Sequence, residues 1–180
     1  MVTTHRYEVS LRWTGNQGTG TSSYRTYSRD HELFGGATGA MVHAAPADQG
    51  AVAKPVILGS SDPAFRGDPA RWNPEELLVA SLAQCHMLWY LHLVTTVGVV
   101  VTDYVDAPFG VMVEDGSGAG HFERVVLRPT VTVAEASMIE AARAAHHRVG
   151  EFCFIARSVN FPVEHEPTTR PPADAPQEYS

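Results

Sequence analysis

The longest apolar stretch of the chain begins just after Asn73, at a clear helix-start signal. Asn73 suits an N-cap because its side-chain oxygen can accept from a first-turn N–H group, and Pro74 loses no hydrogen bond at the next position. Glu76 occupies the third helical position, where a carboxylate can reach back to the backbone of the cap. Apolar residues cover nearly every face of the segment, which indicates a buried helix. The predicted helix spans residues 73–97 and carries Cys85 in its middle.

Alternating apolar and polar residues predict short strands before this helix. They fall within residues 5–60, at Tyr7–Trp13, Tyr24–Tyr27 and Lys54–Gly59. The first two would form a hairpin around a glycine-rich turn, and the small residues from Gly35 to Gly50 indicate a loop.

The chain after the helix, residues 99–165, mixes strands with a second helix. The predicted strands are Val99–Val105, Gly110–Glu114, Phe122–Val133 and Ser158–Glu164, and the predicted helix runs from Met138 to about Val149. A break at Gly150 separates that helix from Cys153.

Strands and helices come in blocks and do not alternate regularly, which predicts an α+β fold with antiparallel sheets packed on the long central helix. The length suits a single domain, which we place at residues 1–165. A proline-rich tail follows at residues 166–180, and its composition predicts flexibility.

The charge pattern narrows the classes of partner. The formal net charge is −7 and no run of Lys or Arg occurs, which argues against nucleic acid and against an anionic membrane surface. The N-terminus lacks the apolar core of a signal peptide. The most apolar segment of the chain is interrupted by Gln84, His86 and His92, which argues against a membrane span. We therefore expect a cytoplasmic protein. In that reducing compartment two cysteines are free thiols or a transient redox pair.

Cys85 and Cys153 are the only cysteines, and together they could form a reactive and a resolving thiol. The alternative for Cys85 alone is a small buried hydrophobe. A reactive cysteine must be a thiolate, and Cys85 lies too far along its helix for the N-terminal dipole to help. It therefore needs a cation, for which the loop residues Arg29 and Arg66 are both candidates. A buried arginine in turn needs a carboxylate, which Glu75 could supply unless it only stabilises the helix terminus.

The helix geometry raises the question of a second subunit. Ten residues separate Glu75 from Cys85, which corresponds to a rise of about 15 Å in a straight helix. Either the helix bends near its start, or Glu75 and its arginine serve a site in another subunit. A long buried helix in a small chain also needs a partner surface, so both considerations favour a homodimer with composite sites.

The sequence resembles the OsmC/Ohr family of osmotically inducible and organic hydroperoxide resistance proteins. The resemblance is carried by the motif from Asn73 to Ala80 followed by Cys85, by Cys153 at the typical distance, and by the Arg29-Asp30 pair. It implies an intertwined homodimer with two long central helices between sheets. It also implies that Cys85 is the peroxidatic thiol, Cys153 is the resolving thiol, and an arginine–glutamate pair lies near Cys85.

The resemblance further implies a stress-response peroxidase that reduces organic hydroperoxides, and possible activity on hydrogen peroxide. Cys85 would attack the peroxide and become a sulfenic acid, Cys153 would close a disulfide with it, and an external lipoyl-type dithiol would reduce that disulfide. No cofactor or metal is required. Aromatic and apolar side chains either line a pocket for the organic group or belong to the core: Phe34, Phe65, Trp72, Met87, Trp89, Phe152 and Phe154.

Two other functions are compatible with the residues. Cys85, Cys153 and several histidines (His86, His92, His146 and His147) are suitable metal ligands, although they form no standard motif and the last two suit an exposed helix surface. A dimer of the same fold could also bind apolar ligands, or act in stress, without turnover. The glycine-rich segment near Gly36 lacks the lysine of a phosphate loop, and no Gly-x-Ser-x-Gly sequence indicates a serine hydrolase.

Overall fold

The computed structural model describes residues 3–35 and 54–172. The chain divides into two compact units, one up to Leu77 and one from Leu78, and each is described by itself. Residues 36–50 of the predicted loop and 173–180 of the predicted tail lie outside the described residues.

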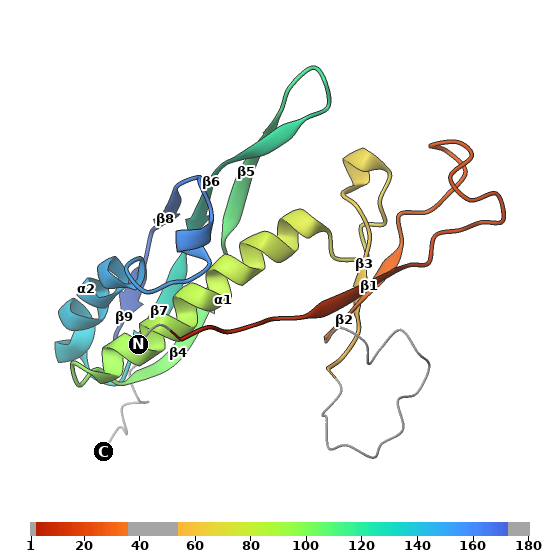
Figure 1. The fold of residues 1–180 in the computed structure, drawn as a ribbon. Helices are drawn as coiled ribbons and strands as arrows, with labels where there is room; N and C mark the ends of the chain where they lie inside the picture. The colour runs from red at the N-terminus through yellow and green to blue at the C-terminus, as the bar shows by residue number, and fades with distance from the viewer. Residues whose placement is uncertain (1–2, 36–53, 173–180) are drawn as a thin grey trace, which may run out of the picture. The chain divides into compact units, whose positions relative to one another are not determined.

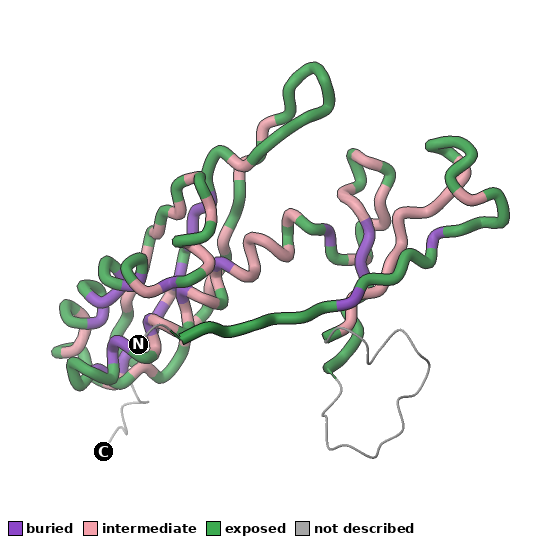
Figure 2. The backbone as a smooth tube through the Cα atoms, viewed as in Figure 1, coloured by how far each residue is buried: buried purple, intermediate pink, exposed green. Residues whose placement is uncertain are grey.

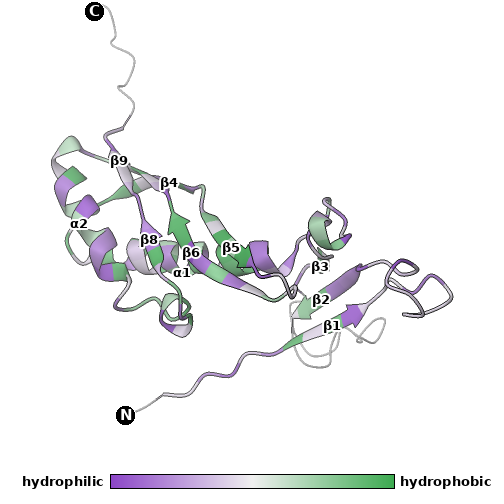
Figure 3. Cartoon of the chain, turned by 90° about the horizontal axis from the view of Figure 1, so that it is seen from above, coloured by the Kyte–Doolittle hydropathy of each residue, from purple (hydrophilic) through white to green (hydrophobic). Residues whose placement is uncertain are grey.

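The first unit contains a three-stranded antiparallel sheet in the order β1-β2-β3 and a short 3-10 helix, η1. Their bounds are β1 Val9–Trp13, β2 His31–Gly35, β3 Ile57–Gly59 and η1 Pro63–Phe65 (Figure 1). The strand predicted at Tyr24–Tyr27 is wrong, because that stretch forms turns and the partner of β1 is β2. β2 begins with hydrophilic His31 and Glu32 and ends with hydrophobic Leu33 and Phe34, so it lacks the alternation that marks a strand (Figure 3).

The helix α1, Pro74–Thr95, begins with the capping box that the sequence predicts. The backbone N–H of Glu76 donates to Oδ1 of Asn73 at 2.7 Å, and the backbone N–H of Asn73 donates to Oε2 of Glu76 at 3.2 Å. At the other end Gly98 adopts a left-handed φ of +73°, which glycine takes without a steric penalty. The predicted helix is thus confirmed to within two residues at each end.

The second unit packs α1 and α2 with two further sheets. The orders of these sheets are β4-β7-β9 and β5-β6-β8. The bounds are β4 Val101–Asp106, β5 Phe109–Glu114, β6 Gly120–Leu127, β7 Pro129–Val133, α2 Ile139–Val149, β8 Val163–His165 and β9 Thr168–Arg170, with short 3-10 helices η2 Ala136–Met138 and η3 Ala156–Ser158. The predicted second helix is confirmed, whereas Thr168–Arg170 of the predicted tail forms the strand β9.

The structure corrects the long strand predicted at Phe122–Val133. It divides at Arg128 into β6 and β7, which belong to different sheets. Arg128 is held outside the ladder, since its backbone N–H donates to Oδ1 of Asp106 and its Nε donates to the carbonyl of Ala107, both at 2.8 Å. The sheets are also not purely antiparallel: β8 pairs with β6 and β9 pairs with β7 in parallel, because the chain crosses over through α2 before it returns.

Two hydrophobic clusters hold the second unit together. Figure 2 marks the buried positions along the backbone in purple. Leu82 of α1 packs on Val125 and Leu127 of β6. The larger cluster joins α1, β7 and α2 and includes Tyr90, Leu93, Val94, Val131, Val133, Ala142, Ala145, Val149 and Cys153. Within the described residues α1 alone is long and apolar enough to cross a membrane by length and composition, a test that the core helix of a soluble protein also passes.

Candidate functional site

The second unit brings Cys85 and Cys153 together. Cys85 projects from the middle of α1, and Cys153 follows the end of α2, where its backbone N–H donates to the carbonyl of Val149 at 2.9 Å. The two side chains are neighbours, since Cys85 acts directly on the pKa of Cys153, and both cysteines are free thiols. A disulfide between them therefore needs only a local adjustment of two neighbouring side chains.

The two thiols differ in their exposure. Cys153 is buried in the core with 2% of its surface exposed, whereas Cys85 is only half-buried. Burial, followed by the interaction with the neighbouring Cys85 side chain, raises the pKa of Cys153 to about 11. The backbone N–H of Ala156 donates to the Cys153 sulfur at 3.4 Å and acts in the opposite direction. Cys153 is therefore a thiol at neutral pH, and Cys85 is the more accessible sulfur.

Aromatic side chains lie beside the cysteine pair. Trp89, one helical turn after Cys85, stacks on Phe152 with ring centroids 5.3 Å apart and meets Phe154 edge-on at 5.7 Å. Cys85, Trp89 and Phe152 all pack against the core cluster that contains Cys153. A shallow hollow of about 330 Å³ is lined by Trp89 and its neighbours Leu88 and His92. These side chains give the surface next to Cys85 an apolar character.

Arg29 is fixed within the first unit. Its guanidinium group donates to the carbonyl of Tyr27 at 2.7 Å and to the carbonyl of Tyr24 at 2.8 Å. The same group lies 4.2 Å from the ring centroid of Tyr24 and 4.4 Å from that of Tyr27, which are cation–π distances. The stretch Tyr24–Tyr27, for which a strand was wrongly predicted, therefore holds the guanidinium group of Arg29 in one orientation.

Arg66 lies on the same polar hollow as Arg29. The hollow has a volume of about 440 Å³, and its charged lining residues are Arg25, Arg29, Asp30, Arg66 and Asp68. Arg66 is the C-cap of the short helix η1, with a left-handed φ of 67°. Its backbone N–H donates to the carbonyl of Pro63 at 3.0 Å. Both candidate arginines therefore sit in one polar site of the first unit.

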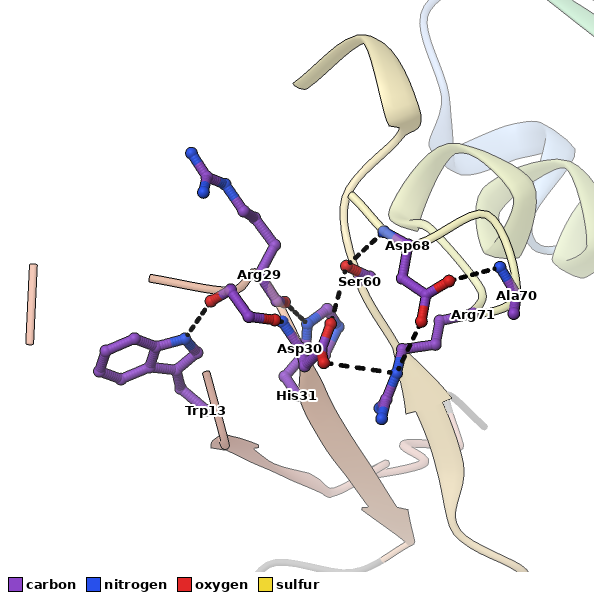
Figure 4. Close-up of polar contacts among 9 residues, drawn as sticks. Trp13, Arg29, Asp30, His31, Ser60, Asp68, Ala70 and Arg71 are labelled. Atoms are coloured by element: carbon purple, nitrogen blue, oxygen red, sulfur yellow. Dashed lines mark hydrogen bonds and ion pairs between the residues drawn. The ribbon is translucent and has the colours of Figure 1, made fainter. Parts of the chain in front are cut away.

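Arg71, which the sequence analysis did not single out, ties the loops of this site together (Figure 4). Its Nε lies 3.7 Å from Oδ2 of Asp30 and 3.6 Å from Oδ2 of Asp68. Ser60, which is fully buried, donates to Asp30 and accepts from the backbone N–H of Asp68. Arg71 thereby connects the neighbours of Arg29 and Arg66. Its pair with Asp68 lies within one loop, but its pair with Asp30 joins residues far apart in the sequence, which no local pattern predicts.

Glu75 belongs to the first turn of α1, within the first unit. Its Oε2 atom is buried and has no hydrogen-bond partner among the described residues. An unpaired carboxylate oxygen is costly unless a donor reaches it. Glu75 thus has the unused acceptor that an arginine partner requires, which a residue serving only the helix terminus does not need.

The second unit also contains a cluster of histidines. His86 of α1, His146 and His147 of α2, and His165 of β8 make ring contacts with centroids 5.3–6.4 Å apart. His146 is fully buried, so the expectation of an exposed His146-His147 surface is wrong for His146. In the described part of the chain no three His, Cys, Asp or Glu side chains are arranged to hold a metal ion.

These features define an α+β protein with a paired-thiol site. The family model described as "OsmC-like protein" matches residues 67–168, and the chain belongs to that family. No curated protein matches the chain.

Several solved structures share the fold. An OsmC-like protein of unknown function from Vibrio cholerae matches with a TM-score of 0.72 and 28% identity, over 91% of this chain and 99% of that one. An organic hydroperoxide resistance protein from Elizabethkingia anophelis matches with a TM-score of 0.60 and 13% identity, over 95% and 99% of the two chains. The organic hydroperoxide resistance protein OhrB of Bacillus subtilis matches with a TM-score of 0.53 and 15% identity, over 92% and 98%. These likenesses agree with the predicted α+β fold.

Proposed function

We propose that the protein is a thiol-dependent peroxidase that reduces organic hydroperoxides to alcohols. The observation that carries the proposal is that its only two cysteines, Cys85 and Cys153, are neighbours and are both free. Membership of the OsmC-like family, some of whose structural relatives are named organic hydroperoxide resistance proteins, supports the same reaction.

The difference in exposure supports separate roles for the two thiols. Cys85, the more accessible sulfur, attacks the terminal oxygen of ROOH as a thiolate; the O–O bond breaks, the alcohol leaves with a proton, and Cys85 becomes a sulfenic acid. Cys153 then attacks the Cys85 sulfur, an S–S bond forms and water leaves. An external dithiol, of the lipoyl type, reduces the disulfide and returns both thiols.

The activating cation in this proposal is Arg29 or Arg66. Arg29 is the better candidate, because its guanidinium is already held by two carbonyls and two tyrosine rings, so little side-chain freedom is lost when it binds a thiolate. Glu75 is its proposed carboxylate partner. The proposal includes a homodimer in the cytoplasm whose sites take residues from both subunits, with no cofactor.

The apolar surroundings of Cys85 support an organic peroxide as substrate. Trp89, Phe152 and Phe154 offer a surface to an aryl or alkyl group, whereas hydrogen peroxide gains nothing from it. We therefore propose that cumene hydroperoxide is reduced with a higher kcat/KM than hydrogen peroxide.

The test is peroxide consumption with dihydrolipoamide as reductant. Cys85→Ser should be inactive. Cys153→Ser should consume one peroxide per subunit and stop at a sulfenic acid that dimedone labels. Gln84→Ser changes the exposed side chain next to Cys85 and should keep the wild-type rate. Unchanged consumption by Cys85→Ser would overturn the proposal and leave a non-enzymatic role for the fold.

A comparison of two variants identifies the arginine that activates Cys85. Arg29→Gln should lower the rate of sulfenic acid formation by about tenfold or more, the loss expected when an ion pair to a thiolate is removed. Arg66→Gln should have a smaller effect. The reverse order would assign the activating role to Arg66.

A further inference from the structure

A small cavity lies beside Cys153 in the second unit. Its volume is about 90 Å³, and it is lined on one side by the apolar residues Leu82, Leu127 and Val163. Its polar lining includes Cys153 together with His86, His147 and His165. Since a water molecule occupies about 30 Å³ in the liquid, the cavity has room for about three.

The three histidines that line this cavity, together with His146 next to His86, differ in exposure from the core to the surface. His146 is fully buried and is hydrogen-bonded to His86 at 3.0 Å. His165 is half-buried, and its Nε2 atom is buried without a hydrogen-bond partner among the described residues. His147 is exposed, and its ring lies 5.4 Å from that of His165.

At pH 7 His165 can accept a proton and Cys153 still carries one. Burial, and then the charge of His147, lowers the pKa of His165, so this imidazole is neutral at pH 7 and can accept a proton. The Cys153 thiol, whose pKa is raised to about 11, keeps its proton at the same pH. Attack by Cys153 on another sulfur requires the thiolate, so a base must act during this step.

We propose that His165 is the general base that takes the proton of Cys153 through water in this cavity, and that His147 then passes the proton to solvent. This inference rests on the proposed peroxidase function, of which it concerns only the second step. As the S–S bond forms, the S–O bond of the Cys85 sulfenic acid breaks. Hydroxide leaves and takes a proton to become water, so no net proton is gained or lost. His165 returns to its neutral form after each closure.

His165 is a better base than the other two histidines of the cavity lining. Nε2 of His86 already shares a hydrogen bond with His146, and protonation of both rings would break it. His147 is exposed and suits exchange with solvent. The titratable groups that face His165 are His86 of α1, His146 and His147 of α2, and Glu164 and Cys153 of the cavity lining.

The test separates the two chemical steps. Reduced protein receives one equivalent of cumene hydroperoxide, and samples are quenched at intervals with dimedone, which labels the sulfenic acid, and analysed by mass spectrometry for label and for disulfide. In His165→Gln we expect sulfenic acid to form at the wild-type rate and the disulfide to close about 100-fold more slowly at pH 7, the typical contribution of a general base. In the matched control His121→Gln, an exposed histidine of β6, both rates should equal those of the wild type.

The pH profile excludes a merely structural effect. Closure in the wild type should become independent of pH once His165 is neutral, whereas closure in His165→Gln should keep rising with pH toward the pKa of Cys153. His147→Gln alters only an exposed side chain and should slow closure by a smaller factor, which keeps the idea testable if His165→Gln does not fold. Wild-type closure rates in both variants would overturn the role of the histidines and leave the peroxidase function intact. A wild type that forms no sulfenic acid would overturn both.

Discussion

Nε2 of His86 lies 3.0 Å from Nδ1 of His146, and the two rings are stacked with centroids 5.3 Å apart. His146 also contacts Tyr90, whose ring stacks on it with centroids 3.9 Å apart. One imidazole nitrogen must donate in this hydrogen bond and the other must accept, so the bond is lost when both rings are protonated. The helices α1 and α2 are therefore joined in the core by a pair that is stable only while it is not fully charged.

This pair makes the stability of the protein sensitive to acid. Burial, and then the charge of His165, lowers the pKa of His86 to about 4; burial, and then the neighbouring histidines, lowers the pKa of His146 to about 3. The unfolded chain binds these protons near pH 6.5, so between that pH and about 4 it gains protons that the folded state excludes. The free energy of unfolding should be greatest above pH 6.5 and fall toward pH 4, with on the order of 3 kcal/mol lost for each of the two histidines.

Urea denaturation at a series of pH values measures this effect. His146→Phe keeps an aromatic ring against Tyr90 and removes one titrating group, so it should be less stable at pH 7 but lose less stability on acidification. The exposed His121→Gln variant should follow the wild-type pH dependence. Parallel curves for His146→Phe and the wild type would contradict the assignment.

The ion pairs of Arg71 should contribute to the stability of the first unit. Arg71 and Asp30 are 24% and 28% exposed and Asp68 is 44% exposed, so solvent screens the pairs in part. Arg71→Met should lower the free energy of unfolding by about 1 kcal/mol. The control is Arg143→Met, which breaks a more exposed pair with Glu140 on α2 and should cost about 0.3 kcal/mol. Equal losses in both variants would remove the special role of Arg71.

The left-handed backbone at Arg66 predicts an unusual response to substitution. Its φ of 67° is unfavourable for every residue with a Cβ and worst for a β-branched one. Arg66→Gly should keep or raise the stability, by up to about 1 kcal/mol, whereas Arg66→Ile should lower it by about 1–2 kcal/mol. Thermal unfolding measures both.

The matched control for Arg66 is Arg25, which lines the same hollow without a positive φ. Arg25→Ile should change the stability by less than about 0.5 kcal/mol, as is usual for exposed positions. A stable Arg66→Ile protein would show that the loop can relax around this residue.

Single substitutions should measure how much the capping box of α1 contributes to the free energy of unfolding. Asn73 is 7% exposed, and its Oδ1 satisfies the backbone N–H of Glu76. Asn73→Ala should cost about 1 kcal/mol, whereas Asn73→Asp and Asn73→Ser keep an acceptor and should cost less. Chemical denaturation distinguishes the three, and an Ala variant as stable as the Ser variant would show that the cap is dispensable.

Local interactions made much of this fold predictable from the sequence. The start of α1 follows from Asn73, Pro74 and Glu76, and its end follows from Gly98, because caps and backbone preferences act over a few residues. The strand β5 and most of β6 also follow from the sequence, which predicts strands at Gly110–Glu114 and from Phe122. By contrast, β2 could not be found, because its pairing with β1 and β3 outweighs a sequence that starts with two polar residues.

The sequence by itself determined that Cys85 and Cys153 are the only thiols on which the proposed peroxidase chemistry could rest. Only the tertiary structure decided that the two thiols are neighbours, that Arg71 joins the loops of Arg29 and Arg66, and that His165 meets Cys153 at a cavity. The hydrogen bond between His86 and His146 joins residues 60 positions apart. Such contacts depend on how whole elements pack, and periodicity and capping, which act within one element, carry no information about them.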